Sequence, residues 1–162
     1  MAQVDYFLKI KGIEGESEAG GHETEITVES WSWGESNSGT GHSGGGHGAG
    51  KVSMQDFHFV MRNNKASPKL MLACASGDHI GEALLTCRRA GKDQQEYLKY
   101  KFTDLLVSSY QTGGSSGDIV PLDQISINFA KIVVEYFAQK KDGSLETAPV
   151  KAGWDLKKEA KV

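Results

Sequence analysis

Residues 125–137 read Ile-Ser-Ile-Asn-Phe-Ala-Lys-Ile-Val-Val-Glu-Tyr-Phe, and this stretch carries the strongest fold signal in the chain. Its first half places Ile125, Ile127 and Phe129 on one face of a β-strand, because successive side chains of a strand point to opposite faces. The apolar residues of the second half fall on the other face and are Ile132, Val134 and Tyr136. A strand that is apolar on both faces needs cover on both. Either another subunit supplies the second cover, which favours oligomerisation, or a bulge reverses the faces.

The segments on either side also have β character. Alternating apolar residues, or β-branched and aromatic residues between turn signals, predict strands over 4–10, 22–33, 51–62, 82–89, 95–103, 105–110, 124–139 and 154–158. One short helix is expected over residues 68–76, with Ser67 as its N-cap, Pro68 at its first position and Gly77 as its stop. Seven or eight strands with a single helix indicate a mainly β barrel or sandwich.

Length and composition narrow the function classes. The chain has 162 residues, a mass of 17.5 kDa and a formal net charge of −3, which predicts one domain over residues 1–162 and disfavours nucleic-acid binding. No apolar run approaches the length of a membrane helix, and no secretory signal segment is evident. Without such a signal, Cys74 and Cys87 are expected to be reduced and buried.

Charge is spread unevenly along the chain. Residues 1–50 hold two lysines and eight acidic residues, whereas residues 51–162 hold 16 basic and 13 acidic ones. This polarity either helps copies associate head to tail or has no such role.

Residues 34–50 form a glycine-rich stretch whose only apolar side chain is Ala49. A loop of seventeen residues inside a small domain is usually functional or disordered. Residues 39–44 match a dinucleotide-binding turn and residues 45–51 match most of a phosphate-binding loop, but an alternating strand follows where both motifs require a helix. The five histidines lack metal-ligand spacing, and we expect no cofactor, no metal site and no catalytic residues.

Several segments of the chain, taken together with their order and spacing, resemble the haemolysin-coregulated protein (Hcp) family of bacterial type VI secretion systems. The likeness covers nearly the whole chain. The segments are Trp31-Ser-Trp-Gly34, Gly44-Gly-Gly-His-Gly-Ala-Gly50-Lys-Val52 leading into Gln55-Asp56, Leu70–Gly77, Leu106–Gly117, Asn128–Lys131 and Gly153-Trp154.

The resemblance implies a two-sheet β-barrel with one helix, and a structural rather than enzymatic role. Six copies of such a protein close into a ring, and the rings stack into the inner tube of a contractile injection machine that carries effectors in its channel. The expected partners are therefore further copies of the chain, effectors, and the sheath and spike proteins. Such a protein is made in the bacterial cytoplasm and exported through the system without a signal peptide.

The resemblance also implies candidate site residues. The stretch 34–50 resembles the loop that reaches an adjacent ring, and its candidate stacking residues are Gly34, Gly39, Gly41, His42, Gly44, Gly45, Gly46, His47, Gly48 and Gly50. Ser32 alternates with Trp31 and Trp33, so its hydroxyl faces the channel and contacts effectors if both indoles pack inside the wall. The alternative functions are a monomeric β-sandwich binding module and, less favoured, a nucleotide-binding enzyme using the glycine loop.

Overall fold

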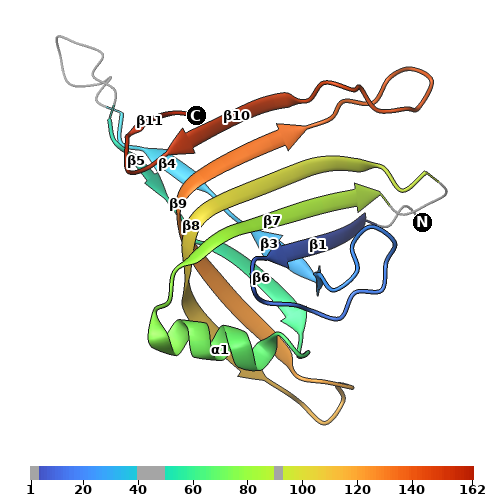
Figure 1. The fold of residues 1–162 in the computed structure, drawn as a ribbon, viewed down its shortest axis with the longest axis vertical. Helices are drawn as coiled ribbons and strands as arrows, with labels where there is room; N and C mark the ends of the chain where they lie inside the picture. Colours follow the sequence, from blue (N-terminus) through green and yellow to red (C-terminus); the bar gives the residue numbers. More distant parts are fainter. Residues whose placement is uncertain (1–3, 40–49, 90–92) are drawn as a thin grey trace.

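The protein is described here from a computed structural model that covers residues 4–39, 50–89 and 93–162. Strands dominate these residues, and one helix packs beside them (Figure 1). The elements, in chain order, are β1 (Val4–Ile10), β2 (Ile26–Val28), β3 (Ser30–Ser32), β4 (Glu35–Asn37), β5 (Val52–Met54), β6 (Phe57–Arg62), α1 (Ser67–Ser76), β7 (Ile80–Arg89), β8 (Glu96–Gly113), β9 (Leu122–Tyr136), β10 (Val150–Asp155) and β11 (Ala160–Lys161).

The two longest strands, β8 and β9, hold the fold together because they belong to two layers at once. In the first layer the strand order is β11-β10-β9-β8-β7-β1-β2, with every neighbouring pair antiparallel. In the second layer the early part of β9 pairs with β6, and β6 pairs with β3. The predicted mainly β fold with one short helix is confirmed.

The chain also passes from the first layer to the second at Glu29, between β2 and β3. β2 pairs with β1 and β3 pairs with β6, and only Glu29 separates β2 from β3. The Glu29 amide donates a hydrogen bond to the Val60 carbonyl at 2.8 Å, which continues the β3–β6 pairing toward β2. The strands therefore wrap around a shared interior rather than lying as an open sheet.

Aromatic side chains fill that interior. Phe57, Phe59 and Phe102 are fully buried, and the Phe102 ring lies 4.8 Å from Phe57 and 5.0 Å from Phe129 between centroids. Each such ring buries roughly 150–250 Å², so a few of them supply much of the apolar burial.

The reversal of faces within residues 125–137 is a bend between the two layers. Phe129 pairs with Leu105 and Lys131 pairs with Thr103, which leaves Ala130 and Asp104 facing each other without a ladder pairing. Asp104 has a φ of 53°, a left-handed conformation that is uncommon for a residue other than glycine. The register is the same on both sides of this point, so no bulge lies there; the register shift between β8 and β9 falls between Val107 and Ser109. As far as Ile132, the apolar residues of both sets pack into one core, so at these positions the chain itself provides the cover.

The helix forms where the sequence predicts it, with one correction at its start. Ser67 is the first helical residue and not the N-cap, which is Ala66 and offers no side-chain hydrogen bond. The Ser67 hydroxyl instead accepts a hydrogen bond from the Asn64 amide and donates one to the buried Asp123 carboxylate. Gly77 ends the helix with a φ of 67°, as expected for a left-handed C-cap.

Some predicted boundaries are wrong. Within the predicted strand 22–33, only β2 and β3 are strands. Residues 12–25 form a loop that is held by its own backbone hydrogen bonds. The predicted loop 34–50 begins with a strand, β4, which pairs with β5. The predicted strand 154–158 starts earlier, as β10, and turns after Asp155 into β11.

Candidate functional site

The hairpin of β4 and β5, called here the arm, is the first part of the candidate site. It leaves the body of the molecule directly after β3 and returns directly into β6 (Figure 1). Its register pairs Glu35 with Met54 and Asn37 with Val52. In the described residues the arm forms a separate two-stranded sheet. An isolated two-stranded hairpin is only marginally stable in water, so the arm depends on contacts with its surroundings.

Asn37 ties the two sides of the arm together. Its side-chain nitrogen donates to the Gly50 carbonyl at 2.8 Å, and its side-chain oxygen accepts from the Gly39 amide at 3.1 Å. At the base, the Gln55 amide donates to the Gly34 carbonyl at 2.9 Å. Gly50 is required by space, because a Cβ atom there would lie 2.7 Å from the Gly39 backbone nitrogen. The structure thus places three of the candidate glycines on the arm; the others, with His42 and His47, lie outside the described residues.

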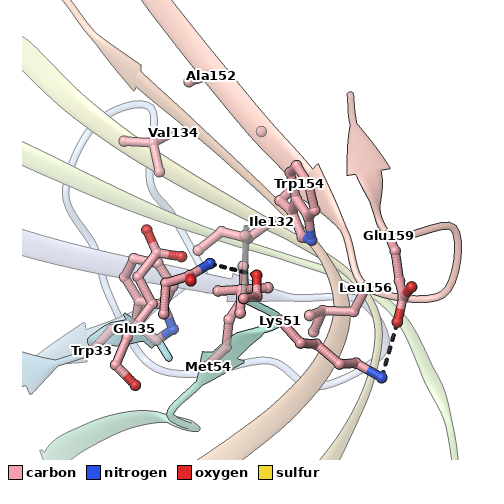
Figure 2. Close-up of a pocket in the computed structure, with 15 residues that line it drawn as sticks. Trp33, Glu35, Lys51, Met54, Ile132, Val134, Ala152, Trp154, Leu156 and Glu159 are labelled. Carbon is pink, nitrogen blue, oxygen red and sulfur yellow. Dashed lines mark hydrogen bonds and ion pairs between the residues drawn. The ribbon is translucent and has the colours of Figure 1, made fainter. Parts of the chain in front are cut away.

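A groove of about 800 Å³ adjoins the arm and forms the second part of the site. Figure 2 shows the arm on one side and β9 to β11 on the other. Its lining is mainly apolar and includes Trp33, Val52, Met54, Ile132, Val134, Ala152, Trp154 and Leu156. Sequence analysis missed this groove, although Trp154 was one of the residues that carried the family resemblance.

An ion pair closes one rim of the groove. The Lys51 ammonium group lies 2.9 Å from a Glu159 carboxylate oxygen, joining the arm to the β10–β11 turn (Figure 2). The hydrogen bond that the Lys51 ammonium group donates to Glu159 raises the pKa of Lys51 above its ordinary value. Both side chains are exposed, so this pair adds little to stability and serves mainly to orient the arm.

Ser32 lies on the third part of the site, the outer face of the second layer. Trp31 points into the core, with its ring 5.1 Å from Tyr100 and 6.0 Å from Tyr6 between centroids. Trp33 packs on the same side against Tyr100 and Phe129. Ser32 is exposed, because it points the other way. The predicted role of Ser32 required both indole rings to pack inside the wall, and both do so.

A row of polar residues continues from Ser32 across four neighbouring strands. Ser32 pairs in register with His58, His58 with Ser126, and Ser126 with Ser109. The His58 Nδ1 and Ser126 Oγ atoms lie 3.2 Å apart, which fixes the imidazole against the sheet. This serine row, formed by Ser32, His58, Ser126 and Ser109, offers hydrogen-bonding groups of modest size and is itself uncharged. The same face also carries Arg62, which alternates with His58 along β6 and forms an ion pair with Glu29.

The other two histidines that the structure describes, His22 and His79, lie apart from each other and from His58. His22 lies beside Glu25 and Glu96, and His79 lies beside Asp104. Nowhere in the described parts of the chain do three or more His, Cys, Asp or Glu side chains converge as metal ligands would. Over the same residues, no helix has the length and apolar character needed to cross a bilayer. The segment after Gly50 is strand β5, as expected, so neither nucleotide-binding motif gains the helix that it requires.

The comparison with protein families decides the identity of the fold. Residues 7–136 match the family described as "Type VI secretion system effector, Hcp". The chain belongs to the Hcp family. It is 46% identical over 155 residues to the protein hcp1 of Pseudomonas aeruginosa, covering 95% of this chain and 96% of that protein. The family resemblance predicted from the sequence is confirmed, and the chain is a tube protein of the type VI secretion system.

Solved structures agree with this assignment. Hcp1 from Salmonella typhimurium is 36% identical and superposes with a TM-score of 0.79 over the full length of both chains. A structure titled as a type six secretion system protein has a TM-score of 0.93 at 29% identity, covering 99% of this chain and all of that one. A chain of the anti-feeding prophage baseplate shares the fold alone, at 11% identity, a TM-score of 0.51, and coverage of 83% of this chain and 93% of that one.

Proposed function

We propose that six copies of this chain close into a ring, that the rings stack through the arm, and that effectors are held in the channel against the serine row. The observation that carries the stacking role is the arm itself, a two-stranded extension outside both layers of the body. Membership of a tube-protein family supports it. In this proposal the protein is made in the cytoplasm, exported without a signal peptide, and meets the sheath and spike proteins of the same machine.

Deleting residues 39–46 tests the stacking role. The deletion leaves β4, β5 and every residue of the two layers in place, so the variant is expected to form hexamers that no longer assemble into tubes. Mass measurement by light scattering reports the hexamer, and negative-stain electron microscopy reports the tubes. Tubes of normal length from the deleted protein would show that the segment is not the stacking element.

Replacing Ser32 with glutamine tests the effector contact. The side chain is exposed, so the longer amide is tolerated by the fold while it projects from the serine row into the proposed channel. We expect normal rings and reduced co-purification of an effector from cells. Ser76→Gln, the same substitution at an exposed position at the end of α1, is the matched control. Unchanged effector retention by Ser32→Gln would refute the contact.

A further inference from the structure

His58 lies at the centre of the serine row. Its neighbours across the sheet are Ser32 on β3 and Ser126 on β9. The Nδ1 atom of the imidazole contacts the Ser126 hydroxyl oxygen at 3.2 Å, and its Nε2 atom forms no hydrogen bond with a described residue. The side chain is half-buried, so the ring is held against the sheet while part of it stays accessible. A ligand that reaches the row therefore meets a positioned imidazole that has one nitrogen to offer.

The other described histidines are each matched by an acidic group of the same chain. His22 lies 3.0 Å from a Glu25 carboxylate oxygen, and His79 lies 2.9 Å from an Asp104 carboxylate oxygen. His58 forms no such pair with a described carboxylate and contacts a neutral hydroxyl group instead. A proton on His22 or His79 is thus balanced nearby, whereas a proton on His58 adds a positive charge that its described neighbours do not balance.

Charged groups do share the face with this imidazole, but each has partners of its own. Asp56 accepts hydrogen bonds from Ser108 at 2.7 Å and from Asn128 at 3.0 Å. Arg62 forms an ion pair with Glu29 at 3.1 Å. Side chains that share the face on the neighbouring strands β3, β8 and β9 are uncharged, and they include Ser30, Ser32, Ser109, Gln111, Gln124 and Ser126. The charge state of the middle of the face therefore depends on the imidazole.

We propose that His58 makes the channel wall select effectors by charge. The inference rests on the proposed function, in which the serine row faces the channel, and it adds the chemical class of the preferred effector surface. Histidine is the side chain whose charge changes between about pH 5 and 8. With neutral imidazoles the row offers hydrogen bonds to any polar surface, whereas protonated imidazoles add one positive charge per chain at one level of the ring. Surfaces rich in carboxylate groups then bind more tightly, and surfaces rich in lysine or arginine bind less tightly.

A fluorescein-labelled peptide of alternating glutamate and serine tests the proposal, with its binding to purified full-length rings measured by fluorescence anisotropy. His58→Lys places a permanent charge at the same point of the row. At pH 8 and low salt we expect this variant to bind the peptide roughly fivefold more tightly than wild type, the gain from one or two exposed ion pairs. The gain is expected to disappear at about 0.5 M salt, because salt screens exposed charges. His79→Lys, which makes the same substitution at an exposed position outside the row, is the matched control and is expected to bind like wild type.

His58→Gln provides the complementary test, because it removes the titratable group and keeps a hydrogen-bonding side chain. Between pH 8 and pH 6.5, wild-type rings are expected to gain roughly twofold or more in affinity for the peptide, and His58→Gln rings are expected to lose most of that gain. Light scattering at both pH values checks that the rings stay intact.

Equal affinity of wild type and His58→Lys for the peptide, including no binding by either, would overturn the proposal. A gain of the same size in His79→Lys would overturn it as well, since the effect would then come from net charge alone. If His58→Lys forms no rings, equal gains of wild type and His58→Gln at pH 6.5 would overturn it. Failure of the proposed function is read separately, from a wild-type protein that forms no rings or from unchanged effector retention by Ser32→Gln.

Discussion

The buried carboxylate of Asp123 is predicted to be one of the most sensitive single positions in the fold. Asp123 has no exposed surface and accepts hydrogen bonds from three different segments. The donors are the Asn63 side chain at 3.2 Å, the Ser67 hydroxyl at 2.5 Å and the Thr112 hydroxyl at 2.6 Å. These contacts connect the start of β9 to the end of β6, the start of α1 and the end of β8, and so hold the strands that carry the serine row.

The magnitude for Asp123→Ala follows from these contacts. A hydrogen bond to a charged group contributes about 1.5–3 kcal/mol, and the substitution leaves three donors without their acceptor. The full sum overestimates the effect, because the substitution also removes the cost of burying a carboxylate. Breaking a buried charged cluster typically costs about 3–5 kcal/mol, a large part of the roughly 5–15 kcal/mol that stabilises a protein of ordinary stability.

Urea unfolding followed by circular dichroism measures this change. With a slope of about 2 kcal/mol per molar urea, the midpoint is expected to fall by about 2 M. Wild type and variants are compared at the same protomer concentration, because association of copies raises the apparent stability in a concentration-dependent way. Asp118→Ala, which removes an exposed carboxylate bonded to Ser115, is the control and is expected to change stability by less than about 0.5 kcal/mol. A midpoint for Asp123→Ala within about 0.3 M of that of wild type would refute the reasoning, since a difference this small is comparable to the experimental error.

Two further predictions concern the helix end and the cysteines. Gly77→Ala places a Cβ atom on a residue with a left-handed backbone and is expected to lower the free energy of unfolding by about 1 kcal/mol. The midpoint of thermal unfolding measures this change. An unchanged midpoint would contradict the role of Gly77 as the helix cap. Burial raises the pKa of the Cys87 thiol to about 12, so a maleimide at pH 8 should modify the partly exposed Cys74 and leave Cys87 unmodified until the protein unfolds. Since the unfolded thiol loses its proton near its ordinary pKa of 9.0, this group's contribution to stability is complete below about pH 9 and is lost as the pH rises toward 12. Equal labelling of single-cysteine variants would contradict this assignment.

Local patterns were sufficient to predict the fold class. Alternation of apolar residues predicted β1 and most of β6, β7, β8 and β9, and the Ser-Pro start with the Gly77 stop predicted the helix to within one residue. These signals are local, because they depend on side-chain periodicity and on φ preferences of single residues.

The remainder depended on contacts between distant residues. Ser67 reads as an N-cap in sequence, but its hydroxyl is taken by Asp123, 56 residues away. β5 lies within the predicted strand 51–62, but its partner β4 reads Glu-Ser-Asn, a polar segment in which alternation gives no sign of a strand. The groove combines residues from the arm, β9, β10 and the β10–β11 turn, so only the assembled chain reveals it. The role of Ser32 in contacting effectors stays a prediction that its exposed position makes testable.

The mass of the purified protein in solution, measured by light scattering during size exclusion at several concentrations, tests the account most directly. We expect a species of six times the 17.5 kDa chain mass, whose mass depends on concentration only through the stacking of whole rings. A monomer at every concentration would contradict the proposed function, because a channel lined by the serine row would then not exist.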